Sequence, residues 1–370
     1  MPINIHKISP LRVVRGEGAW TNSIEAITKL CKRPLIIGRS RSTKKVRTSF
    51  ERDLLSKGIQ PISFELNHDC CELDIQNAYK FSKDNNCDGI IAAGGGKVLD
   101  AGKLIAELLS INCITVPLSA STCAGWTALS NIYTPEGKFI KDVTLKRCPK
   151  LLIFDHSIVR TAPPRTLASG IADAVAKWYE SSLTSSKSQD GFIQQAVQMA
   201  RVLRDQLFLN GYKAFIDPKS SSWKTVAEGC ALTAGIIGGL GGARCRTAAA
   251  HPIHNGLTQL DFNNKPLHGE LVGFGLLVQL HLEEKNSNSQ LPKQAKSQLI
   301  DFLSQLNLPI STESICLKNI NSNELLKACR FACKEDSDIH KLPFPISERE
   351  LLEAIQSYQS LPTFSNRSFK

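Results

Sequence analysis

The chain has 370 residues, of which 42% are hydrophobic and 21% charged, as in an ordinary soluble protein long enough for two domains. The formal net charge of +11 would suit a nucleic-acid-binding protein, but the sequence has no nucleic-acid-binding motif and no basic face interleaved with aromatic residues. We therefore expect no nucleic-acid partner and a diffuse surface charge that could steer anionic substrates.

The sequence suggests neither a membrane anchor nor a secreted protein. No apolar run approaches the roughly 20 residues that span a bilayer. The apolar core of a signal peptide is missing from residues 1–16, MPINIHKISPLRVVRG. We expect a cytoplasmic location and no membrane partner. The twelve cysteines include no CxxC pair, which is typical of free, mostly buried thiols in a reducing compartment.

The first half of the chain alternates predicted strands and helices. In chain order these are strand 12–15, helix 19–30, strand 34–37, helix 43–55, strand 61–66, helix 72–83 and strand 89–93. A helix ending at residue 109, strand 113–117, a hairpin over 131–140 and strand 151–154 follow. The alternation predicts a parallel sheet with helices on both faces.

Strand 89–93 runs directly into Gly94-Gly95-Gly96-Lys97, and an apolar helix follows. Glycines let a backbone approach a pyrophosphate closely, and a helix N-terminus offers N–H groups to its oxygens. Three glycines alone would suit any tight turn, whereas their place between a strand and a helix favours a phosphate site. A second glycine-rich run, GIIGGLGG at 235–242, follows a helical pattern, so it predicts tight helix packing or a bend.

A break at Thr161-Ala-Pro-Pro164 separates this half from long helical patterns with almost no strand signal. We expect an α/β dinucleotide-binding domain over 1–162 and a helical domain over 163–370. Ser347 and Glu350 have capping-box spacing, which predicts a last helix over 351–357.

Three histidines lie close together in the second half. His251 and His254 are three residues apart, so on a helix they share a face, and Pro252 indicates that the helix begins there. The polar segment 261–266 could fold His268 back towards them. Neutral imidazoles suit zinc or ferrous iron, although histidines at this spacing are also common as ordinary surface or core residues.

The histidine segment, AAAHPIHNGLT followed by LHGE and an apolar helix, resembles the metal-binding segment of the iron-containing alcohol dehydrogenase and glycerol dehydrogenase superfamily. The resemblance covers nearly the whole chain, with the motifs in the family's order. It implies an N-terminal Rossmann-like parallel-sheet domain followed by an all-helical, metal-binding C-terminal domain. It also implies a homo-oligomeric enzyme whose metal is bound by Asp173, His251 and His268.

Lys177 is a departure from part of that family. Members with four metal ligands carry a histidine four residues after the aspartate, where this chain has Lys177. The three remaining ligands resemble those of the glycerol dehydrogenase branch and favour Zn²⁺, with Fe²⁺ as the other possibility. Alternatively, Asp173 simply pairs with Lys177 across one helical turn.

The family's strand–GGGK–xxD–helix motif binds the dinucleotide phosphates, which implies this role for Gly94, Gly95, Gly96, Lys97 and Asp100. Similar glycerol dehydrogenases place an aspartate after the strand at 34–37, where it binds the adenosine ribose and repels a 2′-phosphate. This chain has Arg39 and Ser40 there, so we expect both to bind the coenzyme and to favour NADP(H) over NAD(H). A solvated basic loop is the alternative.

The segment 119–130 resembles the family loop between nicotinamide and substrate, and we expect Ser119, Ser121 and Thr122 to contact the coenzyme. Polyol-oxidising members have aspartate where this chain has Cys123. The sequence around Trp126, TCAGWTALS, most resembles the hydroxycarboxylate dehydrogenase A-like branch, which reduces 2-oxo acids.

We therefore expect a metal-dependent NAD(P)(H) oxidoreductase that interconverts a small 2-oxo acid and its 2-hydroxy acid. Cys123, Lys177 and His254 are its predicted catalytic residues, with His254 as a proton relay. The alternatives are a glycerol or polyol dehydrogenase, a lyase resembling dehydroquinate synthase, and a basic binding protein without catalysis.

Overall fold

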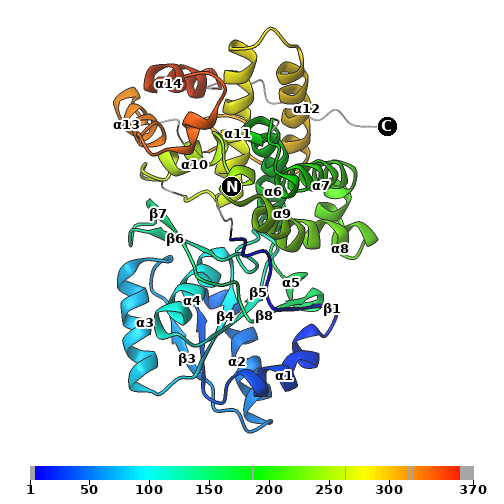
Figure 1. The fold of residues 1–370 in the computed structure, drawn as a ribbon, viewed down its shortest axis with the longest axis vertical. Coiled ribbons are helices and arrows are strands. Elements are labelled where there is room, and N and C mark those ends of the chain that lie inside the picture. The colour runs from blue at the N-terminus through cyan, green and yellow to red at the C-terminus, as the bar shows by residue number, and fades with distance from the viewer. Residues whose placement is uncertain (1–4, 186, 263, 316, 318–319, 359–370) are drawn as a thin grey trace. The chain divides into compact units, whose positions relative to one another are not determined.

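The computed structural model describes residues 5–185, 187–262, 264–315, 317 and 320–358, shown in Figure 1. The chain divides into two compact units, Met1–Arg246 and Thr247–Lys370.

The first unit contains a sheet of six parallel strands in the order β1-β8-β5-β4-β2-β3. The strands are β1 (Arg12–Gly16), β2 (Pro34–Gly38), β3 (Ile62–Glu65), β4 (Gly89–Gly94), β5 (Asn112–Pro117) and β8 (Leu151–Asp155). The chain moves outward from β2 to β3 and then, from β4 onward, in the opposite direction. In open α/β sheets ligands bind at such a reversal, beyond the carboxyl ends of the strands.

Both faces of this sheet are covered by helices, α1 (Ala19–Leu30), α2 (Arg41–Leu55), α3 (Glu72–Asp84), α4 (Gly96–Leu109) and the short α5 (His156–Val159). Ile36 lies opposite Ile91 in a core that includes residues of α1 and α2. Leu35 lies opposite Ile90 in a second core that includes residues of α3 and α4. Side chains alternate between the two faces, so the apolar strands are buried on both sides, as the sequence predicted.

The predicted hairpin is confirmed as the antiparallel pair β6 (Leu129–Tyr133) and β7 (Phe139–Thr144). Gly137 adopts a φ of +85° in the connecting turn, a conformation that favours glycine. Tyr133 N–H donates to the Cys70 carbonyl at 2.8 Å, which fastens the hairpin to the turn before α3.

The same unit also contains the α-helices α6 (Pro164–Ser185), α7 (Gly191–Ile216), α8 (Ser221–Glu228) and α9 (Ala234–Gly241). A Cβ on Gly170 of α6 would lie 2.0 Å from the Ala120 carbonyl oxygen, and one on Gly235 of α9 would lie 2.4 Å from Trp126 Cγ. These close approaches join the helices to the segment after β5. The compact unit ends at Arg246. The predicted division into a dinucleotide-binding domain over 1–162 and a helical domain over 163–370 stays a prediction.

The glycine-rich run at 235–242 has the structural role that its helical pattern predicted. A Cβ on Gly239 would lie 2.2 Å from the Ile8 carbonyl oxygen, and Gly242, at a φ of +58°, ends α9.

Among the described residues, one continuous helical stretch, Ser221–Cys245, is long and apolar enough by length and composition to cross a membrane. This finding qualifies the expectation that no apolar run approaches that length. In the most apolar 18-residue part of this stretch, 56% is buried inside the protein, as in a core helix.

The second unit is built from α10 (Ala250–Leu257), α11 (His268–Lys285), α12 (Leu291–Gln305), α13 (Ser322–Ala332) and α14 (Glu348–Gln356). Pro252 lies in the first turn of α10, as expected. The capping box is confirmed before α14: Glu350 N–H donates to Ser347 Oγ at 3.3 Å, and Ser347 N–H donates to Glu350 Oε2 at 2.8 Å.

Candidate active-site residues

The glycine turn after β4 leaves an open position at Gly95, the N-cap of α4. A Cβ on Gly94 would lie 2.7 Å from Val98 Cβ, and one on Gly96 would lie 2.5 Å from Thr122 Cγ2, so packing inside the protein already requires these two glycines. A Cβ on Gly95 would meet only Ser119 Oγ, at 4.0 Å. Gly95 therefore offers its backbone to a ligand at the start of a helix, where an anion is stabilised.

Arg39 and Lys97, two residues assigned to the coenzyme, both form ion pairs with Asp69. Asp69 is buried and follows β3, and Lys97 Nζ also lies 4.4 Å from the centre of the Tyr133 ring. Asp69 is not among the residues predicted from the sequence. Its position could have indicated a role in the site. Asp69 follows the C-terminal end of β3, and β3 lies beside β2, the strand that leads to Arg39.

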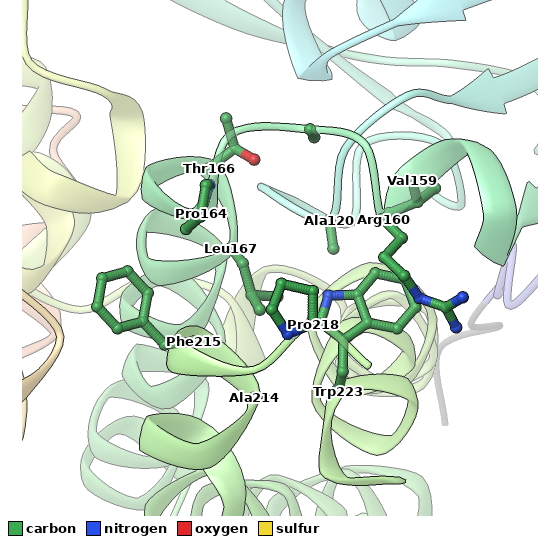
Figure 2. A pocket seen from close by; sticks show the side chains of 11 residues that line it. Ala120, Val159, Arg160, Pro164, Thr166, Leu167, Ala214, Phe215, Pro218 and Trp223 are labelled. Carbon is green, nitrogen blue, oxygen red and sulfur yellow. The ribbon is translucent and has the colours of Figure 1, made fainter. Parts of the chain in front are cut away.

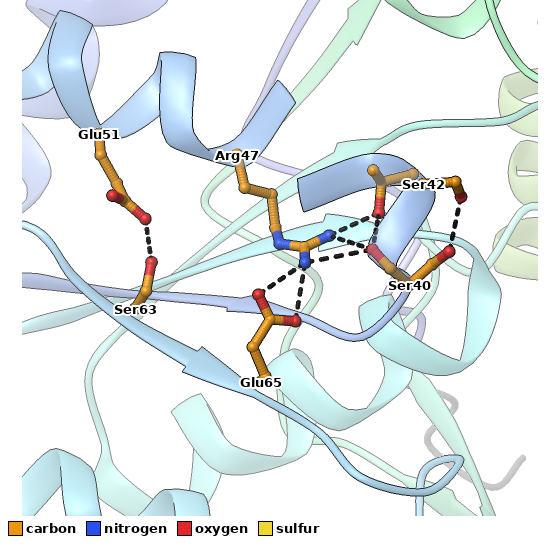
Figure 3. Close-up of polar contacts among 7 residues, drawn as sticks. Ser40, Ser42, Arg47, Glu51, Ser63 and Glu65 are labelled. Carbon is orange, nitrogen blue, oxygen red and sulfur yellow. Dashed lines mark hydrogen bonds and ion pairs between the residues drawn. The ribbon is translucent and has the colours of Figure 1, made fainter. Parts of the chain in front are cut away.

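The turn from β2 into α2 is held by a buried arginine, as Figure 3 shows. Arg47 Nη2 donates to both carboxylate oxygens of Glu65, each at 2.7 Å, and Nη1 donates to Thr43 Oγ1 at 2.5 Å. The Ser40 and Ser42 hydroxyl oxygens lie 2.7 Å apart, within hydrogen-bond distance. A Cβ on Gly38 would lie 2.0 Å from Arg47 Nε, so the glycine makes room for this arginine.

The segment after β5 is fixed by its own polar contacts. Ser119 Oγ and Ser121 Oγ lie 3.0 Å apart, Thr122 Oγ1 accepts from Ala124 N–H at 3.3 Å, and Thr115 Oγ1 donates to the Gly125 carbonyl at 2.7 Å. The three predicted coenzyme contacts therefore lie in one short turn beside Gly95 and Gly96.

Cys123 has a pKa above its usual value, because burial disfavours the thiolate. The charge of Lys177 opposes this effect and that of Asp173 adds to it, so both side chains act on the Cys123 thiol. A thiol with a raised pKa is neutral at pH 7.

Asp173 and Lys177 lie one turn apart on α6 and form a buried pair, with Lys177 Nζ 3.4 Å from Asp173 Oδ1. Burial alone would lower the Lys177 pKa, but Asp173, Cys123 and Glu180 outweigh it, so the pKa is raised. Lys177 is therefore a buried cation. The ion pair between Asp173 and Lys177, which their spacing in the sequence allowed, is therefore present. The role of Asp173 as a metal ligand stays a prediction.

Three of the histidines of the second unit lie together. His251 and His254 are on α10 and His268 begins α11. The ring centres of His251 and His268 lie 5.7 Å apart, and His268 Nδ1 lies 3.0 Å from His254 Nε2. The expectation that His268 folds back towards the first two is confirmed.

A chain of close polar contacts links these rings to Asn255. Asn255 Oδ1 lies 2.8 Å from His254 Nδ1, and since a carbonyl oxygen only accepts, this contact is a hydrogen bond in the tautomer with the hydrogen on Nδ1. In that tautomer His254 would accept at Nε2 from His268 Nδ1–H, which lies 3.0 Å away. The lone pair of His268 would then be on Nε2, the form that binds a metal. Asn255 was not singled out in the sequence.

Comparison with known proteins identifies the family. Residues 10–156 match the family model described as iron-containing alcohol dehydrogenase. The chain is 42% identical to an uncharacterised oxidoreductase of Synechocystis, over 96% of this chain and 92% of the relative. It is 30% identical to a glycerol dehydrogenase of Thermotoga maritima, over 95% of each. It is 29% identical to hydroxycarboxylate dehydrogenase A of Escherichia coli K12, over 79% of this chain and 80% of the relative.

The chain belongs to the iron-containing alcohol dehydrogenase superfamily. Among solved structures, a glycerol dehydrogenase of Schizosaccharomyces pombe matches with a TM-score of 0.82 and 27% identity, over 97% of this chain and 91% of that chain. The predicted fold class is therefore confirmed, an N-terminal Rossmann-like part followed by helices. Membership makes the protein an oxidoreductase and implies a divalent metal and a nicotinamide coenzyme.

The residues of this oxidoreductase fit both groups. The open backbone position at Gly95 suits a dinucleotide phosphate, and an imidazole nitrogen of His268 suits a divalent cation. Asp100, by contrast, lies within α4, where it pairs with Lys103 at 2.9 Å and accepts from Asn131 N–H at 3.2 Å. These contacts link α4 to β6, so a direct coenzyme contact for Asp100 stays a prediction.

Proposed function

We propose that this protein is a metal-dependent NAD(P)(H) oxidoreductase that interconverts a small 2-oxo acid and its 2-hydroxy acid. In the reducing direction, a 2-oxo acid, a hydride from NAD(P)H and a proton give the 2-hydroxy acid and NAD(P)⁺.

One observation carries the substrate class: Cys123, a neutral thiol, lies within the electrostatic influence of the buried cation Lys177. Related polyol-oxidising enzymes have a carboxylate where this chain has Cys123. A carboxylate there would repel an anionic substrate, whereas a neutral thiol near Lys177 tolerates one. The similarity to hydroxycarboxylate dehydrogenase A supports the same class.

We assign the coenzyme to the carboxyl ends of β2, β4 and β5. Gly95 and the first turn of α4 would bind the pyrophosphate, with Lys97 as a cation beside it. Ser119, Ser121 and Thr122 would seat the nicotinamide, and their mutual contacts keep that turn in one conformation. A preorganised seat lowers the entropy lost when the reacting groups are brought together.

For the metal, we propose Asp173, His251 and His268 as ligands, with Zn²⁺ favoured. A bound divalent metal would polarise the substrate carbonyl, and the reduced nicotinamide would supply the hydride. The chain's own part is orientation: Asn255 holds His254, and His254 holds His268 in the ligand-ready tautomer. Since both ring nitrogens of His254 are engaged, this geometry favours an orienting role over the relay role, which stays a prediction.

The proposed preference for NADP(H) rests on Arg39 and Ser40. The carboxylate of Asp69 opposes it, because it pairs with Arg39. A guanidinium beside a serine hydroxyl suits a 2′-phosphate. The ion pair between Arg39 and Asp69 competes for the same guanidinium, so we propose a moderate preference rather than exclusive use of NADP(H).

The test is a panel of 2-oxo acids, aldehydes, dihydroxyacetone and polyols, each with both nicotinamide coenzymes, after the purified protein is reconstituted with zinc. We expect the highest kcat/KM for a small 2-oxo acid. A higher kcat/KM for glycerol or dihydroxyacetone would instead support a polyol dehydrogenase. If the protein turned over none of these substrates, the result would instead favour the lyase alternative.

We also propose a cytoplasmic homo-oligomer that has no membrane or nucleic-acid partner. Light scattering after gel filtration measures the mass of the particle in solution, and a single-chain mass of 40.6 kDa would contradict the oligomer. A gel shift at moderate salt checks for nucleic acid, because basic proteins with a true site bind it measurably there.

A further inference from the structure

We propose that His68, Cys71 and Asp74 form a second divalent-metal site, suited to zinc, in the turn between β3 and α3. One ring nitrogen of His68, the sulfur of Cys71 and one carboxylate oxygen of Asp74 all lie within 4.8 Å of one another. The three residues are separate from those assigned above to the catalytic metal.

The spacing of these atoms already approaches that of a coordination sphere. His68 Nδ1 and Asp74 Oδ1 lie 3.1 Å apart. Two such ligands on a tetrahedral zinc ion, each at about 2.0–2.1 Å, would be separated by roughly 3.3 Å. The Cys71 sulfur lies within 4.8 Å of both atoms. On a tetrahedral zinc ion it would lie roughly 3.6 Å from each, so binding would draw the sulfur closer.

The local fold explains why the three side chains converge. Cys71 is the N-cap of α3, and Asp74 lies in the first helical turn, where its carboxylate points back towards the preceding turn. Asp74 Oδ2 accepts from His68 N–H at 2.6 Å, which draws His68 over the end of the helix. Cys71 also forms a bridge with Tyr133 of β6, so the backbone at the site is held from both sides.

Burial and charge favour a metal in this turn. Cys71 and Asp74 are each 1% exposed, and the Cys71 side chain makes no capping hydrogen bond. The His68 side chain is 35% exposed, which leaves an approach for an ion from solvent. A neutral imidazole, a thiolate and a carboxylate together carry two negative charges, which a divalent cation neutralises; binding would release the thiol proton to solvent.

The proposed ion would lie next to a residue that matters for the coenzyme. Asp69 follows His68 directly and pairs with Arg39 and Lys97. By fixing the turn, a metal would hold the Asp69 carboxylate in place between these two cations. The role would be structural and separate from hydride transfer.

Cobalt substitution tests this site separately from the catalytic one. The full-length protein is stripped of metal, loaded with Co²⁺ and examined by absorption spectroscopy and metal analysis. A thiolate ligand gives an intense sulfur-to-cobalt band in the near ultraviolet, which a site with only nitrogen and oxygen ligands lacks. We expect two Co²⁺ per chain and this band in the wild-type protein.

The variants assign the band. Cys71→Ser should remove the band and one ion. His68→Gln changes a partly exposed side chain, so it tests the site even if Cys71→Ser folds poorly, and it should weaken binding at least tenfold. Cys70→Ser, Cys123→Ser and His251→Ala should keep the band, and His251→Ala should lose the other ion. A wild-type protein without the band, or a Cys71→Ser protein that retains it, would overturn the proposal and leave the proposed function standing.

Discussion

Lys177 lies one helical turn after Asp173 on α6, with its Nζ 3.4 Å from the Asp173 carboxylate and both side chains buried. The sequence alone offers Asp173 either as a metal ligand or as the partner of Lys177. The two roles are compatible, because a carboxylate has a second oxygen. Lys177 also interacts with the Cys123 thiol, so its charge acts on the proposed substrate site as well.

Replacement of Lys177 should therefore affect anionic substrates selectively. We expect Lys177→Gln to lower kcat/KM for 2-oxo acids by at least tenfold, or about 1.4 kcal/mol, because the cation that favours their carboxylate is lost. Neutral aldehydes should be affected far less. Steady-state kinetics on both classes measure this difference, and an equal loss on both would mean that Lys177 acts only by holding Asp173.

Loss of a metal ligand should abolish turnover and reduce metal content together. We expect this of Asp173→Ala, His251→Ala and His268→Ala, since three ligands leave little redundancy. His254→Ala should keep the metal but bind it about 10–100-fold more weakly, because His268 loses its orienting partner. Metal analysis and activity are compared with His340→Ala, an exposed histidine on the second unit. A ligand variant with full metal content and activity would show that the ligand set is wrong.

The Arg39–Asp69 ion pair should set the balance between the two coenzymes. Arg39→Asp should weaken NADPH binding by about 1–3 kcal/mol relative to NADH, because a charge-assisted contact becomes a repulsion. Asp69→Asn should shift the preference towards NADPH, because Arg39 is released from its carboxylate. Coenzyme titrations followed by fluorescence give both constants. Lys45→Asp, the same charge change at an exposed position on α2, is the control. An unchanged ratio in both test variants would mean that this turn does not contact the ribose.

Cys123→Asp tests the substrate class directly. Two like charges about 4 Å apart at an effective dielectric constant near 20 repel by about 4 kcal/mol, and partial solvation reduces this. We expect lower kcat/KM for 2-oxo acids and higher kcat/KM for dihydroxyacetone or glycerol, whose hydroxyls can donate to the new carboxylate. Cys123→Ser, which adds no charge, is the matched control and should retain the preference for 2-oxo acids. Equal loss on both classes in Cys123→Asp would leave the substrate assignment without support.

Glu283 should make the stability of the protein depend on pH. Burial raises the pKa of Glu283 from 4.5 to about 7, while Gln279, which donates to its Oε1 at 2.9 Å, opposes the shift. Because the folded pKa is the higher one, the stabilisation is present below pH 4.5 and is lost as the pH rises through about 7. The unfolding free energy should fall by up to about 3 kcal/mol over that window. Denaturant titrations of wild type and Glu283→Gln measure it, and a variant with the same pH dependence would contradict the assignment.

Much of the fold follows from local patterns in the sequence. Strand and helix periods, the glycine turn after β4 and the capping box at Ser347 involve residues within a few positions of one another, so they are visible before any tertiary contact forms. The proximity of His251 and His254 is of the same kind, because both lie on one face of one helix.

What only the tertiary structure decided are contacts between residues far apart in sequence. Asp69 meets Arg39 and Lys97 because β3, β2 and β4 place their carboxyl ends at one edge of the sheet. Glycines at 170 and 235 let helices of the first unit approach Ala120 and Trp126 closely. The contacts of His268 continue through His254 to Asn255. Local propensity carries no information about such pairings, because their free energy arises only when the chain is packed and the partners have left water.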